Sequence, residues 1–239
     1  KFGGGGYKIS GGLHGVGASV VNALSEKVEV NVRRDGLEYE IDFVRGKTNS
    51  KLHQVGKAKG TGTKVTFWPD PEIFTETTIY DYDTLANRFR EMAFLNKGIR
   101  ITFTDERTDP ITERVFYYEG GIIEFVKYLN KNKEVLFEEP IYIEGIIKGT
   151  SVEVAFQYND SYQENIYTFA NNIHTPEGGT HLTGFSTALT RAINEYGRQF
   201  GFLKAADANL KSEDVRESIA AVISVKLVEP QFEGQTKYK

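Results

Sequence analysis

The sequence predicts an α+β fold built as two domains, because helix-like segments and antiparallel strand patterns occur on both sides of a glycine pair. Residues 28–33 and 37–43 alternate apolar and polar side chains around an Asp-Gly turn, the pattern of a half-buried hairpin. Residues 182–200 instead carry apolar side chains at helical spacing. A chain of 239 residues is long enough for one large or two small domains. We place the boundary at Gly120 and Gly121, which gives domains at residues 1–120 and 121–239.

The first domain is expected to contain a short helix, antiparallel strands and one longer helix. The short helix follows Gly17, and a strand at residues 63–68 ends at Pro69, which cannot donate a ladder hydrogen bond. Residues 46–62 are polar and are expected to form a loop. The remaining elements are a core-facing helix over residues 85–93 and two strands, 99–103 and 115–118.

The second domain is expected to start with a helix and to end in an extended polar tail, residues 231–239, after Pro230 stops the last strand. His174 and His181 show no metal-ligand spacing and are expected in a loop. In chain order we expect a helix at 122–130, strands at 141–147 and 152–158, a polar loop containing the glycines at 178–179, a helix at 182–200, a short turn at 213–217 and a buried strand at 219–228.

Composition excludes several classes of protein. No apolar run approaches the ~18 residues of a membrane span, and no signal-peptide pattern is present. The absence of cysteine excludes disulfides and thiolate metal sites and agrees with a cytoplasmic location. A net charge of −4 argues against a chain that coats nucleic acid electrostatically. The chain begins at Lys1 and its single methionine is Met92, so we expect it to be a piece of a longer polypeptide.

Glycines at positions 12, 15 and 17 lead directly into the first expected helix and favour a phosphate ligand. Without Cβ atoms, backbone N–H groups can approach a charged group closely, and a helix start adds unpaired donors and a positive dipole end. A second glycine run at residues 3–6 lies among lysines, so the two runs together suggest a lid over a nucleotide. Taken alone, the run at residues 3–6 is also explained by a flexible linker, and the glycines at residues 12–17 by a turn before a helix. The spacing is neither the dinucleotide G-x-G-x-x-G pattern nor Walker A.

A longer series of motifs resembles one family over essentially the whole chain. Residues 1–25 resemble the ATP-lid segment of the B subunits of DNA gyrase. Further matches in the family's order lie at residues 60–63, 67–69, 118–121, 128–133, 178–181 and 235–237. The B subunit of topoisomerase IV, a decatenating enzyme, is a close relative that these segments do not separate from gyrase.

This resemblance implies an ATPase subunit of a bacterial type II DNA topoisomerase, in the Bergerat (GHKL) class. Residues 1–120 would be the C-terminal part of a Bergerat-type α/β sandwich ATPase domain, and residues 121–239 a transducer domain with a ribosomal S5 domain 2-like fold. In the family, ATP binding and hydrolysis drive dimerisation and DNA strand passage with negative supercoiling. The implied cofactors are ATP and Mg²⁺, and the implied partners are a gyrase A-type subunit in an A2B2 heterotetramer and double-stranded DNA.

The resemblance also implies which residues contact ATP. The backbone of residues 13–17 would hold the β- and γ-phosphates, and Thr63 would lie near the adenine. Gln235 and Lys237 would reach the γ-phosphate from the transducer, although taken alone they are typical of a solvated tail, and Thr63 is typical of a strand. The full set of implied ATP-binding residues is Lys1, Tyr7, Gly12, Leu13, His14, Gly15, Val16, Gly17, Thr63, Gln235 and Lys237.

Part of the family's catalytic machinery is expected to lie outside this chain. The family's general base is a glutamate, and a Mg²⁺-binding asparagine follows it on the same helix; both precede the lid, so no catalytic residue and no metal ligand is assigned here. A general base must lie within hydrogen-bond reach of its water, so we expect this chain alone to hydrolyse no ATP. Alternatives of other classes are an ATP-gated clamp of the MutL or Hsp90 type without strand passage, and a histidine kinase. The motif at residues 235–237 favours the topoisomerase.

Overall fold

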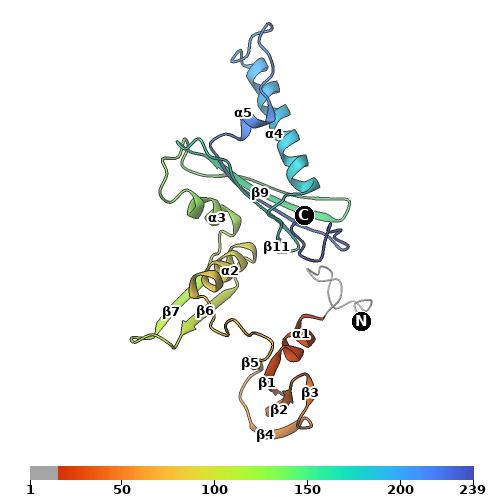
Figure 1. The fold of residues 1–239 in the computed structure, drawn as a ribbon. Coiled ribbons are helices and arrows are strands. Elements are labelled where there is room, and N and C mark those ends of the chain that lie inside the picture. Colours follow the sequence, from red (N-terminus) through yellow and green to blue (C-terminus); the bar gives the residue numbers. More distant parts are fainter. Residues whose placement is uncertain (1–15) are drawn as a thin grey trace. The chain divides into compact units, whose positions relative to one another are not determined.

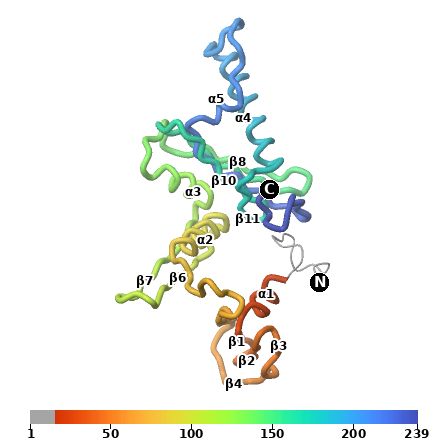
Figure 2. The backbone as a smooth tube through the Cα atoms, viewed as in Figure 1, coloured from red at the N-terminus to blue at the C-terminus, as the bar shows by residue number. Residues whose placement is uncertain are grey.

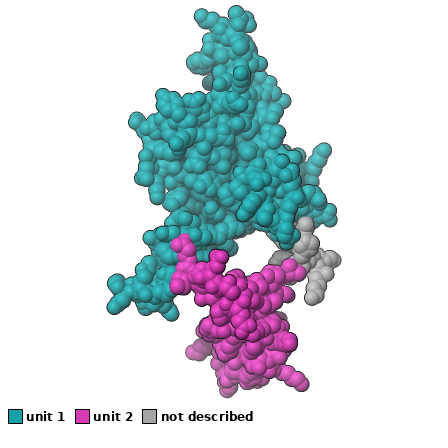
Figure 3. All heavy atoms as spheres, viewed as in Figure 1, with its two compact units in different colours: residues 1–11, 82–239 teal, residues 12–81 magenta. Residues whose placement is uncertain are grey.

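The structure is a computed structural model that describes residues 16–239 (Figure 1). The chain divides between Asp81 and Tyr82 into two compact units (Figure 3). Residues 16–81 are the described part of the smaller unit, and residues 82–239 are that of the larger one. Helices and strands are mixed in both units, so the predicted α+β class is confirmed.

The smaller unit is an antiparallel sheet with one short helix. Its elements are α1 Gly17–Ala23, β1 Ser25–Arg34, β2 Leu37–Val44, β3 Lys47–Thr48, β4 His53–Lys57 and β5 Gly62–Pro69. Strand β1 lies between β2 and β5, while β3 and β4 both pair with β2. The β1–β2 connection is tight because Asp35 and Gly36 both have positive φ, as a type I′ turn requires. The hairpin predicted from the alternating sequence is therefore confirmed.

One face of this sheet is apolar along its three long strands. Val65 on that face is 54% exposed and Phe67 is 41% exposed. Among residues 16–81, Val28 is the only apolar side chain that is buried. A sheet face of this kind is stable only when another layer covers it, so the unit buries little of its apolar surface by itself. The cross-strand sets on this face are Val28 with Phe43 and Phe67, Val30 with Ile41 and Val65, and Val32 with Tyr39 and Thr63.

A buried carboxylate holds the segment that follows β5. Asp70 is 2% exposed, and its Oδ2 lies 2.8 Å from Nε of Arg45. Its Oδ1 accepts the backbone N–H of Glu72 at 2.9 Å. The N–H of Asp70 donates to the carbonyl of Leu24 at 3.1 Å. These contacts tie the end of α1 to the end of β5.

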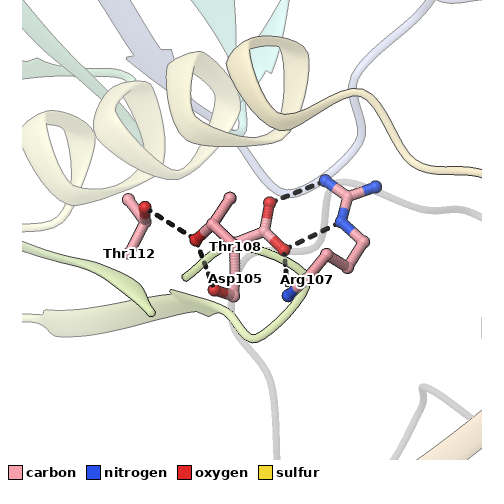
Figure 4. A network of polar contacts seen from close by, with 4 residues as sticks. All are labelled: Asp105, Arg107, Thr108 and Thr112. Atoms are coloured by element: carbon pink, nitrogen blue, oxygen red, sulfur yellow. Dashed lines mark hydrogen bonds and ion pairs between the residues drawn. The ribbon is translucent and has the colours of Figure 1, made fainter. Parts of the chain in front are cut away.

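The larger unit begins with a helix, α2 Tyr82–Leu95, that packs on the hairpin of β6 Arg100–Asp105 and β7 Thr112–Tyr117. The hairpin turn is closed by Asp105, whose carboxylate accepts Nε and Nη2 of Arg107 at 2.8 and 2.7 Å (Figure 4). The backbone N–H of Arg107 adds a third bond at 3.0 Å. These hydrogen bonds lower the pKa of Asp105 from 3.8 to about 2.

The main sheet of the larger unit has five strands. Strands β10 and β12 are parallel, and the other neighbouring pairs are antiparallel. A parallel pair needs a long crossover, which α4 Thr180–Gln199 and α5 Ser212–Arg216 provide (Figure 2). In spatial order the strands are β11 Ile173–His174, β10 Asn165–Ala170, β12 Ile219–Lys226, β9 Thr150–Tyr158 and β8 Ile141–Ile147.

Helices cover both faces of this sheet (Figure 1). On one face, α3 Ile122–Leu129 and the C-terminal end of α2 share a core with β9, β10 and β12. On the other face, α4 packs through Leu182, Phe185 and Leu189. Strand β12 is therefore buried on both sides, which explains its nearly continuous apolar sequence. The buried residues on the α3 side are Phe94, Leu95, Ile122, Phe125, Val126, Ala155, Phe169, Ala220 and Val222.

Several expected segments differ from the structure. The expected loop at residues 46–62 contains β3 and β4, and the polar loop expected before α4 contains β10 and β11. His174 accordingly lies in β11 and His181 in α4, rather than in a loop. Tyr196 and Phe200, expected on the buried stripe of the long helix, are 57% and 56% exposed, because only the first part of α4 packs on the sheet.

The two compact units are not the two domains expected from the sequence. Phe94 and Leu95 of α2 belong to the same core as α3, so the compact units divide at Asp81 and not near Gly120. A compact unit is defined by packing, whereas the expected domains follow a family resemblance. The domain boundary after residue 120 therefore stays a prediction.

Candidate functional site

The start of α1 has the features of an anion-binding helix end. Val16 is the N-cap residue, and the N–H of Val20 donates to its carbonyl at 2.8 Å. The N–H groups of the first turn have no acceptor within the helix. The first turn carries no acidic residue, and Val16 is 49% exposed. A Cβ built on Gly17 meets none of the described atoms within 4 Å, so the described residues leave space beside this helix start.

Thr63 lies on the apolar face of the smaller unit's sheet. It is the second residue of β5 and pairs with Val32 of β1, and its side chain is exposed. Val65 follows it on the same face. A single hydroxyl beside uncovered apolar surface suits a flat ligand that buries its rings and makes few directed hydrogen bonds. The position therefore agrees with the adenine contact that the resemblance implies.

A pocket of about 330 Å³ lies at the other end of this face. Val21 of α1 and its C-cap residue Leu24 line it together with Phe67 of β5 and Tyr80. The rings of Phe67 and Tyr80 meet edge to face at 6.5 Å. Thr63 does not line this pocket, since it lies four residues from Phe67, roughly 13 Å along the strand.

The second group of expected site residues lies in the tail of the larger unit, and this tail is not extended as predicted. The N–H of Lys237 donates to the carbonyl of Gly234 at 3.1 Å, which forms a turn with Gln235 at its tip. The N–H of Glu233 donates to the carbonyl of Lys239 at 2.9 Å, and their side chains pair at 2.9 Å. Because both backbone and side chains join its ends, the tail is a closed loop.

The loop presents Gln235 and Lys237 differently. Gln235 is exposed, whereas Lys237 is half-buried with its Nζ 5.8 Å from the centre of the Phe232 ring. Lys237 has a φ of 59°, a conformation that persists only where its surroundings fix it. The N–H of Glu177 donates to the carbonyl of Tyr238 at 3.0 Å and anchors the loop to the segment before α4.

A second pocket, of about 530 Å³, lies at the base of this loop. Its lining includes Thr175, His181 and Phe232, but neither Gln235 nor Lys237. Nε2 of His181 lies 3.1 Å from Oγ1 of Thr175. Burial lowers the pKa of His181 below its usual 6.5, so its imidazole is neutral at pH 7.

The structure places the predicted site residues in two groups. The smaller unit holds Val16, Gly17 and Thr63, and the larger unit holds Gln235 and Lys237. The remaining predicted residues lie outside the described part of the chain: Lys1, Tyr7, Gly12, Leu13, His14 and Gly15.

Sequence reasoning missed Asn171 and Asn172, which form the turn between β10 and β11. Asn171 donates to the carbonyl of Leu227 just after β12, and Asn172 donates to Asn96 just after α2. A signal for them was present. Two asparagines between apolar runs are typical of a tight turn with positive φ.

Known proteins match the chain over its full length. The DNA gyrase B protein of Clostridium acetobutylicum is 62% identical over 240 residues, which cover 100% of this chain and 37% of that protein. The DNA gyrase B protein of Halalkalibacterium halodurans is 58% identical over 239 residues, with the same coverage of 100% and 37%. The chain thus spans little more than a third of the length of these relatives.

A family model described as DNA gyrase B matches residues 121–239. The chain belongs to the DNA gyrase B family. Solved structures agree with this assignment. The 43K ATPase domain of Thermus thermophilus gyrase B, in complex with an aminocoumarin, matches with a TM-score of 0.80 and 43% identity over 92% of this chain and 60% of that one. The topoisomerase IV ATP-binding domain of Francisella tularensis matches with a TM-score of 0.75 and 30% identity, over 96% and 62%.

The gyrase B relationship confirms the resemblance that the motifs indicated. It also explains why sequence motifs from the lid to the tail keep one order along the chain. Identity to the gyrase B structure from Thermus thermophilus, 43%, exceeds the 30% to the topoisomerase IV domain.

Proposed function

We propose that the chain is part of the ATP-binding subunit of a bacterial DNA gyrase, a type II topoisomerase. In the whole subunit, ATP binding and hydrolysis drive dimerisation and DNA strand passage with negative supercoiling. The observation that carries this proposal is the match of the entire chain to gyrase B sequences, at 62% identity to the protein from Clostridium acetobutylicum. The likeness to a solved gyrase B ATPase domain supports it.

The proposed nucleotide is ATP with Mg²⁺, and the described residues fit its phosphates. The start of α1 offers an open set of N–H donors with no carboxylate in its first turn. Val16 and Gly17 belong to this helix start, which residues 12–15 precede, and Lys1 and Tyr7 complete the lid. Thr63 faces the adenine from β5. The Mg²⁺ ligand and the catalytic glutamate belong to sequence upstream of Lys1, so this chain alone binds phosphate without cleaving it.

Gln235 and Lys237 contact the γ-phosphate from the loop of the larger unit. An ammonium that hydrogen-bonds an ionised phosphate contributes about 1.5–3 kcal/mol. ADP lacks the γ-phosphate and therefore this contact, so only ATP engages the loop. A ligand shifts a conformational equilibrium only through such a difference in contacts. Lys237 therefore distinguishes the ATP-bound from the ADP-bound state.

The family match supports the proposed domain organisation. The gyrase B family model begins at residue 121, at the proposed boundary between an ATPase part and a transducer domain. This start agrees with domains at residues 1–120 and 121–239.

The proposed partners are a gyrase A-type subunit in an A2B2 heterotetramer, a second copy of the ATPase subunit, and double-stranded DNA. The proposed location is the cytoplasm. Within residues 16–239, every helix is too short or too polar to cross a lipid bilayer.

A substitution at Lys237 in the full-length protein tests the nucleotide contact. Lys237→Ala should keep binding of a fluorescent ATP analogue while losing ATP-dependent dimerisation and supercoiling, because the contact that distinguishes ATP from ADP is gone. Lys148→Ala, at an exposed lysine of the same unit, is the matched control and should match wild type. Normal dimerisation of Lys237→Ala on ATP would overturn the proposed role.

Strand-passage assays with the gyrase A-type partner separate the gyrase proposal from its alternatives. Negative supercoiling of relaxed plasmid supports gyrase. Decatenation without supercoiling would instead assign a topoisomerase IV component. ATP-dependent dimerisation without any strand passage would assign a clamp of the MutL or Hsp90 type.

A further inference from the structure

A turn of two asparagines connects helix α2 to the base of the loop that carries Gln235 and Lys237. Strands β10 and β11 are joined by Asn171 and Asn172 alone, since the residues on either side of them pair with each other. Their φ angles are 49° and 64°, and a two-residue type I′ turn requires positive φ at both positions. Glycine is favoured at the second position because it adopts this region without a steric penalty. Asparagine there is costlier, so its side chain must provide something glycine cannot.

Asn171 extends the main sheet by one residue into the tail. Its backbone N–H donates to the carbonyl of Val225 at 2.8 Å. Its side-chain Nδ2 donates to the carbonyl of Leu227 at 2.8 Å, and its Oδ1 accepts the N–H of Leu227 at 2.8 Å. The side-chain amide thus replaces a neighbouring strand just beyond the end of β10. Leu227 is the first residue after β12, so both of its backbone polar groups are fixed where the chain leaves the sheet, ahead of the loop that Glu233 and Lys239 close.

Asn172 makes its contacts with helix α2. Its Nδ2 donates to Oδ1 of Asn96 at 2.9 Å, and Nδ2 of Asn96 in turn donates to the carbonyl of Met92 at 2.8 Å. Nη2 of Arg88 donates to the backbone carbonyl of Asn172 at 3.2 Å, and Arg88 also pairs with Glu91 at 3.0 Å. The turn is therefore held by Asn96 at the C-terminal end of α2 and by Arg88 within the helix.

We propose that the Asn171–Asn172 turn is a positioning element that keeps the base of the Gln235–Lys237 loop in register with helix α2. The inference rests on the proposed contact of Lys237 with nucleotide. A peptide bond joins the two asparagines, and hydrogen bonds connect Asn172 to Asn96 and Asn171 to Leu227. A displacement of the end of α2 would thereby move Leu227 and the segment that leads into the loop.

The variant Asn172→Gly in the full-length protein removes this link and little else. Glycine suits the φ of 64°, and the backbone carbonyl that accepts from Arg88 remains, so only the bond to Asn96 is lost. Lys148→Gly is the matched control, because Lys148 has a φ of 50° in the β8–β9 turn of the same sheet and its side chain is exposed. Its substitution relieves the same kind of turn without breaking the α2 link.

The measurements are thermal unfolding, affinity for a non-hydrolysable ATP analogue, and dimerisation induced by that analogue. Asn172→Gly should unfold and bind the analogue as wild type does, since the lost hydrogen bond is offset by relief of the turn. Its analogue-dependent dimerisation constant should fall by roughly 2- to 30-fold, the range that coupling contributions of about 0.5–2 kcal/mol span. In steady-state ATPase assays kcat should fall while KM stays constant, and unchanged thermal unfolding would exclude a smaller folded fraction as the cause of that fall.

A second variant distinguishes the bond between Asn172 and Asn96 from the bond by which Asn96 caps the end of α2. Asn96→Asp keeps the oxygen that accepts from Asn172 but loses the bond to Met92, so it should destabilise α2 and still dimerise as wild type does. If wild type responds to the analogue and Asn172→Gly responds equally, the inference is wrong and the proposed function stands. If wild type neither binds the analogue nor dimerises with it, the proposed function is wrong and the inference falls with it.

Discussion

Replacing Phe94 by alanine would measure how firmly helix α2 is joined to the main sheet. Phe94 is 1% exposed, and its ring stacks on Tyr118 at a centroid distance of 3.8 Å and on Phe125 at 4.7 Å. Truncating a buried phenylalanine costs about 3–5 kcal/mol, from lost transfer free energy and the cavity that remains. The two aromatic pairs, each worth about 0.5–1.5 kcal/mol beyond buried area, place the expected cost in the upper part of this range. We therefore expect Phe94→Ala to lower the free energy of unfolding of residues 82–239 by about 4–5 kcal/mol.

Urea unfolding followed by far-ultraviolet circular dichroism and by tryptophan fluorescence provides the assay. The single tryptophan, Trp68, lies in β5 of the smaller unit, so its fluorescence reports on that unit separately. Phe94→Leu keeps most of the buried volume and should cost about 1.5 kcal/mol or less. A loss below about 1 kcal/mol for Phe94→Ala, the size of an average substitution, would refute the packing of α2 on the sheet.

Acid should weaken the β6–β7 turn, because Arg107 holds the pKa of Asp105 at about 2 when folded against 3.8 when unfolded. The stabilisation is complete above pH 3.8 and is lost as the pH falls toward 2. Asp105→Asn removes the titrating group, so the urea midpoint of the variant should decrease less than that of wild type across this pH window. An equal decrease in both proteins would contradict the argument. The buried amide of Gln157 accepts Nδ2 of Asn130 at 2.9 Å and donates to the carbonyl of Phe137 at 2.6 Å. Gln157→Leu leaves these partners unpaired at about 1–3 kcal/mol each, and a urea midpoint equal to that of wild type would rule out this network.

The alternation of apolar and polar residues predicted those strands that have one apolar face and one polar face. Strands β1 and β2 alternate cleanly because one face is polar, and Asp35-Gly36 matches the turn between them. Strand β10 lacks alternation, since it pairs in parallel with β12 and is buried over its last three residues. Strand β4 was missed for the opposite reason, because four of its five residues are exposed and no apolar period marks it.

The candidate site was predictable to a similar, limited degree. Glycine spacing alone placed a helix start after Gly17, as the structure has it. Thr63 gained a role only through the family resemblance, because a threonine in a strand has no distinctive signal. The tail was predicted as extended since its composition is polar. It closes into a loop through contacts between Glu233 and Lys239, and the bond that anchors this loop comes from Glu177, far away in the sequence, which no local pattern encodes.

The strand that is synthesised last among the described elements lies in the middle of the main sheet. On the ribosome, the β8–β9 and β10–β11 hairpins emerge first, and each exposes an open edge until β12 enters between them. Such non-local pairing is slow to form. The chain leaves β12 at Leu227 on its way to the loop with Gln235 and Lys237, and the bonds from Asn171 to Leu227 exist only once the sheet has closed. A nascent or partly unfolded chain would therefore lack the fixed start of this segment, so the proposed response to ATP would mark a protein that has finished folding.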